Sequence, residues 1–361
     1  MSMQPAGATP INLLTGFLGS GKTTLLQRLL TDPAMASAAV LINEFGEVGL
    51  DHHLLDRIDD NVVLMKSGCI CCTVRGEIAD ALLGLHSQRA RGEIPWFDRV
   101  VIETTGLADP FPALSTIQSH PVLRSHFVIA NVVTTVDAVN GQKQLADRLE
   151  AVRQVGAADV VVITKTDLAD EARTADLRAA LTRLNPTARQ VVATDAASSD
   201  FIASSAALRA EGWDAAARHA VDHAAHDHEH NHHHHHHNDD AADAKVRSFA
   251  ITVDGPVDWT AFGIWLTMLL NRHGDRIFRV KGILNIAGED RPVAVHGVQR
   301  LVHAPVHMSA WPDASRQSRI VFIVDDLDPA RIEASFHVFN RLSEKVLSHR
   351  ASGCLETAIP R

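Results

Sequence analysis

The chain has 361 residues, of which 46% are hydrophobic and 21% are charged, and its formal net charge is -9 with histidine counted as neutral. At roughly 100–200 residues per domain, this length predicts about two globular domains, each with a buried core. The negative charge argues against general nucleic-acid binding, and no apolar run reaches the roughly 20 residues of a transmembrane helix, so we expect contact with neither nucleic acid nor membrane.

The first half of the chain alternates short β-branched runs with helical patterns. The strand-like runs lie at residues 11–15, 39–43, 62–65, 100–103, 132–136, 160–164 and 190–193. Continuous apolar strands separated by amphipathic helices are typical of a mostly parallel sheet that is covered on both faces. We therefore expect an α/β domain over residues 8–198.

A phosphate-binding loop follows the first of these strands. Residues 16–23 read GFLGSGKT, a complete match to G-x-x-x-x-G-K-[ST], and a helical pattern follows. In such a loop the backbone N–H groups face phosphate, the lysine reaches the β- and γ-phosphates, and the threonine hydroxyl is a ligand for Mg²⁺. The expected nucleotide-binding residues are Gly16, Gly19, Ser20, Gly21, Lys22, Thr23 and Thr24, with Lys22 also catalytic.

A second nucleotide-contacting segment is expected where the strand at 100–103 ends. Here the sequence reads Glu103-Thr104-Thr105-Gly106, an acidic residue three positions before a glycine. Glu103 is the expected catalytic carboxylate, on the side of Mg²⁺ or of the attacking water, and Gly106 is the expected amide for the γ-phosphate. An ordinary acidic residue at a strand end stays open as the alternative.

A base-recognition segment is expected after the strand at 160–164, where the sequence reads Thr164-Lys165-Thr166-Asp167. The carboxylate of Asp167 can accept hydrogen bonds from N1–H and the exocyclic amine of guanine, whereas adenine presents an acceptor at N1. The T-K-x-D pattern therefore favours GTP over ATP. Thr164 stands where GTPases usually carry asparagine, and a surface turn without function is the alternative.

Three of the four cysteines lie within four positions, in the sequence SGCICC that contains Cys69, Cys71 and Cys72. This spacing does not favour disulfides among them, but it can direct two or three thiolates at one soft or borderline cation. The amino terminus lacks the basic and apolar regions of a secretory signal, which predicts a reducing cytoplasm. We interpret the segment as a transition-metal site, with redox chemistry as the weaker alternative and Cys354 as a bystander.

The regular pattern ends between residues 199 and 245, which are rich in Ala, Ser, Asp and His and include HDHEHNHHHHHHNDD. Without apolar periodicity this segment has no core to form, so we expect a disordered linker. Half of the 22 histidines lie between positions 219 and 237. Neutral imidazoles bind transition metals, so the tract is expected to collect metal, with a solvated spacer as the alternative.

The last part of the chain predicts a smaller α+β domain over residues 246–348, followed by a tail at 349–361. Strand-like runs occupy residues 246–253, 277–286, 293–302 and 320–324, and helical patterns occupy 258–271 and 329–348.

Taken in order, several segments resemble the CobW family of P-loop GTPases, in particular its YjiA-like branch. They are residues 16–24, the NEFGEVGLD sequence at 43–51, the GCICC sequence at 68–72, and residues 103–106, 164–167, 279–283 and 295–301. The resemblance implies a P-loop NTPase domain with a CobW-type C-terminal domain. It also implies a slow GTPase that uses Mg²⁺, binds Zn²⁺ or another transition metal such as Co²⁺ or Fe²⁺, and delivers it to a client metalloprotein.

By position in the family's pattern, the implied metal ligands are Cys69, Cys71, Cys72 and Glu47. Some relatives carry a further metal-binding glutamate where this chain has Ile42. Two other functions stay open: cobalt handling for cobalamin synthesis or for a metal-dependent hydratase, and a P-loop small-molecule kinase with structural zinc. The sequence does not identify the metal or the client protein. It does not determine the oligomeric state either, and a homo-oligomer stays open.

Overall fold

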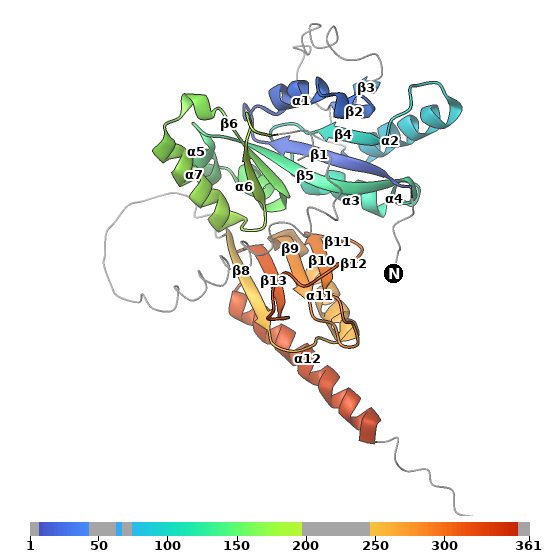
Figure 1. The fold of residues 1–361 in the computed structure, drawn as a ribbon, viewed down its shortest axis with the longest axis vertical. Helices are drawn as coiled ribbons and strands as arrows, with labels where there is room; N and C mark the ends of the chain where they lie inside the picture. The colour runs from blue at the N-terminus through green and yellow to red at the C-terminus, as the bar shows by residue number, and fades with distance from the viewer. Residues whose placement is uncertain (1–6, 43–62, 67–73, 197–245, 353–361) are drawn as a thin grey trace, which may run out of the picture.

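The structure is a computed structural model of the chain, and it describes residues 7–42, 63–66, 74–196 and 246–352. Two sheets organise these residues, one with seven strands and one with six. Figure 1 shows the C-terminal sheet against one side of the N-terminal unit, with the last helix pointing away from it. The expected α/β unit followed by a smaller α+β unit is thus confirmed. The linker predicted at 199–245 lies outside the described residues.

The first sheet is parallel in every pairing and has the strand order β3-β2-β4-β1-β5-β6-β7. Its strands are β1 (Thr9–Gly16), β2 (Ala38–Ile42), β3 (Val63–Lys66), β4 (Arg99–Glu103), β5 (Phe127–Asp137), β6 (Val160–Thr164) and β7 (Arg189–Val192). All seven predicted strands are present, and β5 begins five residues earlier than predicted. Since the strands are parallel, their carboxyl ends share one edge, where ligands bind in sheets of this kind.

Helices cover both faces of this sheet. The described helices of this unit are α1 (Lys22–Leu30), α2 (Val74–Arg91), α3 (Pro110–Ser119), α4 (Leu123–His126), α5 (Gly141–Asp147), α6 (Leu149–Ala157) and α7 (Glu171–Leu184), with short 3₁₀ turns η1 (Pro33–Met35) and η3 (Thr166–Leu168). Along β6, Val160 and Val162 pack into the cluster that contains α1, whereas Val161 and Ile163 pack into the cluster that contains α6 and α7. This alternation explains why the strands are apolar throughout.

The second sheet is antiparallel and has the order β11-β10-β9-β13-β8, with β12 paired to β10. Its strands are β8 (Val246–Val253), β9 (Ile277–Leu284), β10 (Val293–Val298), β11 (Leu301–Val302), β12 (Val306–His307) and β13 (Ser318–Asp325), and its helices are α11 (Trp259–His273) and α12 (Pro329–Ser352), with the turn η4 (Gly274–Arg276). Aromatic residues of both helices, including Trp265 and Phe336, form the core against one face.

The single strand predicted at 293–302 is wrong in its extent, because the structure divides it into β10 and β11. Val298 pairs with Leu301, so the two residues between them form a tight hairpin turn. Gln299 accommodates this turn with a positive φ of 49°. A period-2 pattern continues through such a turn without a break, and neither residue of the turn is a glycine, asparagine or aspartate that would have marked it.

The other face of the second sheet packs against α6. Val152 of α6 contacts a cluster with Phe278 and Ile323, and a Cβ atom at Gly156 would lie 3.1 Å from the Phe278 ring. Phe278 can take this position because β9 carries a bulge there, where Arg279 pairs with Ile323 and the next paired residue is Ile277. The bulge turns both Phe278 and Arg279 toward the N-terminal unit.

A buried ion pair joins the two units beside this contact. Arg279 pairs with Asp159, which precedes β6, and Lys281 Nζ lies 3.4 Å from the same carboxylate oxygen. Arg279 also donates to the carbonyl oxygen of Ala157, at the end of α6. Burial by itself would raise the pKa of Asp159, but the two cations outweigh it and lower that pKa to about 2. The carboxylate is therefore ionised at neutral pH.

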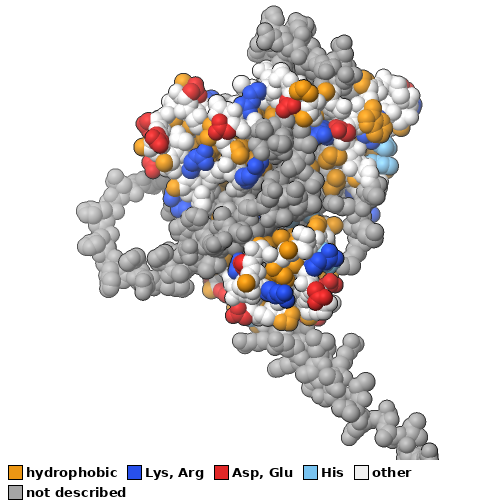
Figure 2. All heavy atoms as spheres, in the orientation of Figure 1, with side chains coloured by type: hydrophobic (Ala, Val, Ile, Leu, Met, Phe, Trp, Pro, Cys, Tyr) orange, Lys and Arg blue, Asp and Glu red, His pale blue; other side chains and the backbone are white. Residues whose placement is uncertain are grey.

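None of the helices in the described part of the chain has both the length and the hydrophobicity that a membrane span needs. Figure 2 shows acidic and basic side chains interspersed on the described surface of that view.

Candidate functional site

The phosphate-binding loop lies between β1 and α1, at the carboxyl edge of the first sheet. Gly16, Gly19 and Gly21 have positive φ values of 144°, 70° and 89°. Gly16 lies so close to β5 that a Cβ atom would come within 2.3 Å of Thr135 Oγ1 and 2.5 Å of its carbonyl oxygen. The buried hydroxyl of Ser20 makes a 2.6 Å hydrogen bond with Thr135 Oγ1. These contacts fix the curl of the loop.

Lys22 and Thr23 begin α1 and point toward the loop and toward β4. Lys22 Nζ donates to the carbonyl oxygens of Gly16 at 2.9 Å and Phe17 at 3.3 Å, so its ammonium group lies across the mouth of the loop. Thr23 Oγ1 donates to Glu103 Oε1 at 2.7 Å. The structure thus brings together the three residues expected to act on phosphate and Mg²⁺, whereas Thr24 is exposed on the first turn of α1.

The segment after β4 lies directly against the phosphate-binding loop. Thr104 donates from its hydroxyl to Thr15 Oγ1 at 2.9 Å, and its backbone N–H donates to Leu14 O. A Cβ atom at Gly106 would lie 2.7 Å from Leu18 N and Cα, so only glycine allows this approach. Gly106 therefore lies against the backbone of the phosphate-binding loop, and its role toward the γ-phosphate stays a prediction.

The expected base-recognition turn follows β6 and is tied to the phosphate-binding loop by Thr164. Thr164 Oγ1 donates to Ser20 O at 2.7 Å and lies 3.3 Å from Val136 O. Thr164 thereby makes a contact between the two nucleotide-binding segments even though it is not asparagine. Lys165 has a positive φ of 56°, and Asp167 is exposed in η3, with its carboxylate open to a ligand from solvent.

Asp137 was not identified as a site residue from the sequence. It ends β5 with 1% of its surface exposed and accepts a hydrogen bond from Lys165 Nζ at 2.7 Å. Its other oxygen accepts from the backbone N–H groups of Val139 at 2.7 Å and Asn140 at 3.2 Å. Burial opposes ionisation, but the bond from Lys165 and those from Asn140 and Val139 lower the pKa of Asp137. The sequence signal for this residue is an acidic side chain at the end of a long apolar strand.

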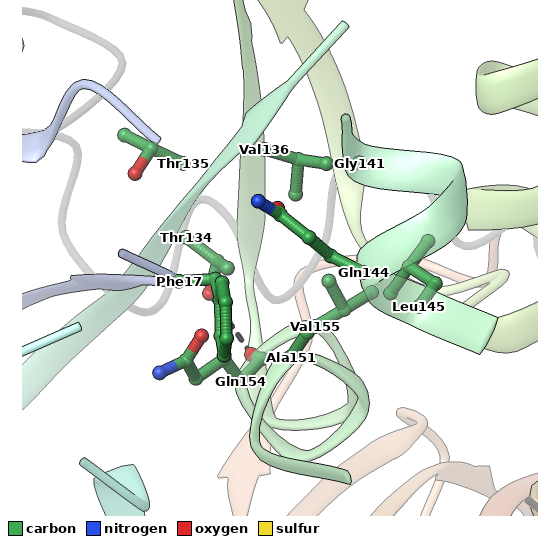
Figure 3. A pocket seen from close by; sticks show the side chains of 10 residues that line it. All are labelled: Phe17, Thr134, Thr135, Val136, Gly141, Gln144, Leu145, Ala151, Gln154 and Val155. Carbon is green, nitrogen blue, oxygen red and sulfur yellow. Dashed lines mark hydrogen bonds between the residues drawn. The ribbon is translucent and has the colours of Figure 1, made fainter. Parts of the chain in front are cut away.

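Gln154 of α6 could not be identified as a site residue from the sequence, because a glutamine within a helical pattern does not indicate a binding site. It is 1% exposed, and its Nε2 donates to Gly106 O at 3.1 Å and Ala108 O at 3.0 Å. Figure 3 shows its side chain beside Phe17 of the phosphate-binding loop, at one end of a small pocket between β5, α5 and α6. This pocket lies behind the loop, on the side of α5 and α6.

The predicted metal ligands Cys69, Cys71, Cys72 and Glu47 lie outside the described residues. The described elements fix where their segments begin and end. β2 ends at Ile42, which pairs with Glu103 of β4; β3 ends at Lys66; and α2 begins at Val74. Within the described ranges, no group of three or more His, Cys, Asp or Glu side chains is arranged to hold a metal ion.

Comparison with known proteins finds the same organisation. The family described as CobW/HypB/UreG, nucleotide-binding domain, matches residues 10–192, and the cobalamin synthesis protein cobW C-terminal domain matches residues 246–340. The zinc chaperone YjiA of Escherichia coli is 36% identical over 326 residues, which cover 90% of this chain and 97% of that protein. The zinc chaperone CobW of Pseudomonas aeruginosa is 31% identical over 366 residues, or 92% of each chain.

A solved structure is similar over almost the whole chain. The crystal structure of the Zn(II)-bound YjiA GTPase from E. coli has a TM-score of 0.67 and 30% sequence identity, and the match covers 92% of this chain and 99% of that one.

Proposed function

The chain belongs to the CobW family, and from this premise we propose that it is a GTP-hydrolysing metallochaperone that binds Zn²⁺ and delivers it to a client protein. The observation that carries the proposal is the contact between Thr23 and Glu103 beside the phosphate-binding loop. This contact supports the proposal, because a nucleoside triphosphate bound by such a loop would present its terminal phosphates to a hydroxyl and a carboxylate.

In this function, Lys22 binds the β- and γ-phosphates, and the backbone N–H groups of the loop and of Gly106 orient them. The donor set at Thr23 and Glu103 consists of oxygen atoms only, which fits Mg²⁺. Thr23 and Glu103 would hold this ion, which supplies positive charge to the phosphates. Glu103 is 4% exposed, and its carboxylate could also orient the attacking water.

The proposed guanine site is the turn after β6, with Asp167 as the carboxylate that recognises the base. Lys165 and Thr164 support this turn through Asp137 and Ser20. Guanine offers N1–H and an exocyclic amine to this carboxylate, whereas adenine has an acceptor at N1. The carboxylate would therefore favour GTP over ATP.

The proposed cargo site consists of Cys69, Cys71, Cys72 and Glu47. Thiolates and a carboxylate suit Zn²⁺, Co²⁺ and Fe²⁺, and the relatives named zinc chaperones favour zinc among them. This also favours zinc delivery over the cobalt-handling alternative. Because the thiols must stay reduced to bind metal, we place the protein in the cytoplasm.

The cargo and nucleotide sites would be coupled through the segment that follows β2. Ile42 ends β2 in register with Glu103, so the segment that contains Glu47 starts next to the proposed Mg²⁺ residue. GTP and Zn²⁺ would then share a coupling free energy, and GTP hydrolysis would weaken the hold on the metal.

The proposal is tested by measuring phosphate release from GTP and from ATP, and Zn²⁺ affinity with a competing chelator, in the purified chain. We expect slow GTP hydrolysis, weaker activity with ATP, and a Zn²⁺ affinity that differs between a non-hydrolysable GTP analogue and GDP. Phosphate transfer to a small molecule instead of water would favour the kinase alternative.

Replacing both Cys71 and Cys72 by serine should remove the tight Zn²⁺ site and leave GTP binding nearly unchanged. Serine has almost the same size, but its hydroxyl is not ionised near neutral pH, so two anionic soft ligands are lost without a large packing change. The matched control is Cys354→Ser, which should keep full Zn²⁺ affinity. If the double variant keeps the tight Zn²⁺ site, these cysteines do not form the cargo site.

In the Asp167→Asn variant, the ratio of GTP affinity to ATP affinity should fall by about 100-fold or more. The reason is that the amide cannot accept from both guanine N–H groups. Competition between labelled GDP and each unlabelled nucleotide measures this preference. The control is Asp170→Asn, since Asp170 lies three residues away and caps α7 by accepting from Arg173 N. Equal GTP and ATP affinities in the unmodified protein would rule out this role for Asp167.

A further inference from the structure

The side chain of Gln154 is hydrogen-bonded to the segment that follows β4. Its Nε2 atom has two hydrogens, and each is given to a carbonyl oxygen of that segment, Gly106 O at 3.1 Å and Ala108 O at 3.0 Å. Only the NH₂ end of the amide can face two carbonyl oxygens, so the orientation of Gln154 is determined by its partners. Two peptide planes within three residues are thereby fixed by one side chain.

Gln154 is itself buried and held through its backbone. Its backbone oxygen accepts a hydrogen bond from Thr134 Oγ1 of β5 at 2.9 Å, and its side chain is 1% exposed. Phe17 of the phosphate-binding loop lines the same pocket, as Figure 3 shows. A side chain fixed in this way does not adapt freely to a displaced partner, so it imposes its position on Gly106.

The helix that carries Gln154 is clamped between the two units of the chain. Val152 and Gly156 pack against Phe278, and the carbonyl oxygen of Ala157 accepts from Arg279. These residues face the second sheet, whereas Gln154 faces the nucleotide site. The place of the Gly106 segment is therefore set by a helix that both units hold.

We propose that Gln154 is a positioning residue for GTP hydrolysis, which holds the Gly106 segment in the arrangement that receives the γ-phosphate. This inference rests on the proposed GTPase function. Gly106 lies against the backbone of Leu18, and its amide is joined through one Cα to the carbonyl that Gln154 holds. If that carbonyl is released, a change of φ or ψ at Gly106 would turn the amide away from the phosphate site. GDP has no γ-phosphate, so loss of Gln154 should affect the triphosphate more than the diphosphate.

The test is Gln154→Met, which keeps the length of the side chain and removes both N–H donors. We expect kcat for GTP to fall about 10- to 100-fold, because loss of positioning by a fraction of an ångström to one ångström has effects of this size. GDP affinity should stay within about 2-fold of wild type, so the affinity ratio of a GTP analogue to GDP should fall. Gln144→Met is the control, since Gln144 lines the same pocket from α5 and the substitution is the same.

A second variant, Gln154→Glu, has a side chain of equal size whose carboxylate would face the two carbonyl oxygens, so it should lower kcat at least as far. A purely structural role predicts that GDP and the analogue lose affinity together, and this result would overturn the inference. Wild-type kcat and affinity ratio in the variants would also overturn it, as would loss of GDP binding in both. An unmodified protein that hydrolyses no GTP would instead refute the proposed function.

Discussion

The Lys22→Ala variant is expected to lose at least about 100-fold in kcat/KM for GTP. Lys22 Nζ lies over the phosphate-binding loop, within 2.9 Å of Gly16 O, and is the cation that faces the β- and γ-phosphates. The stabilisation that its positive charge provides grows in the transition state, as negative charge builds up on the phosphates. Lys22 is only 9% exposed, so solvent screens this interaction little. Removal of one such preorganised donor in other enzymes costs roughly 10²–10³-fold.

Phosphate release under multiple turnover measures this loss, and fluorescence of a labelled GDP measures binding separately. The matched control is Lys143→Ala, which removes an exposed lysine from α5 in the same unit and should leave hydrolysis unchanged. The Lys22 variant should keep the thermal stability of the wild type within a few degrees, because the hydrogen bonds that its ammonium group donates to Gly16 O and Phe17 O lie within a surface-accessible loop rather than in the apolar core. Turnover at the wild-type rate would remove the assignment of residues 16–23 as the phosphate site.

The strands and the phosphate-binding loop could be predicted because their signals are local. A parallel strand buried on both faces is a continuous apolar run, and the loop needs its glycines, lysine and threonine at fixed spacing. The expectation that Glu103 and Gly106 belong to the site comes from their place after such a run. The order of strands in the sheet then brings these segments to one edge without any further information from the sequence.

The contacts that support these residues could not be predicted, since they join positions far apart in the chain. Gln154 lies 48 residues from Gly106, and Asp159 lies 120 residues from Arg279. Neither glutamine in a helix nor arginine in a strand has a pattern that reveals its partner. Thr164 shows the same limit, because only the packed structure shows its hydroxyl reaching the Ser20 carbonyl.

The Asp159→Ala variant is expected to lose about 3–5 kcal/mol of stability, because it leaves Arg279 and Lys281 buried without their shared carboxylate. Asp159 Oδ2 also accepts from Val132 N at 2.9 Å, and this N–H would lose its acceptor. Urea unfolding followed by fluorescence and by circular dichroism measures the loss and tests whether the two units separate first. The control is Asp98→Ala, which breaks an exposed Asp98–Arg99 pair and should cost less than about 1 kcal/mol.

The contribution of the Asp159 ion pair should also depend on pH in a defined window. The pKa of Asp159 is about 2 in the folded protein, below the value near 3.9 of an unfolded aspartate. A lowered folded-state pKa means that the stabilisation is complete above pH 4 and is lost as pH falls toward 2. The stability difference between wild type and Asp159→Ala should therefore shrink by about 2 kcal/mol between pH 5 and pH 2. A difference that stays constant over this range would show that the ionised carboxylate does not hold the two units together.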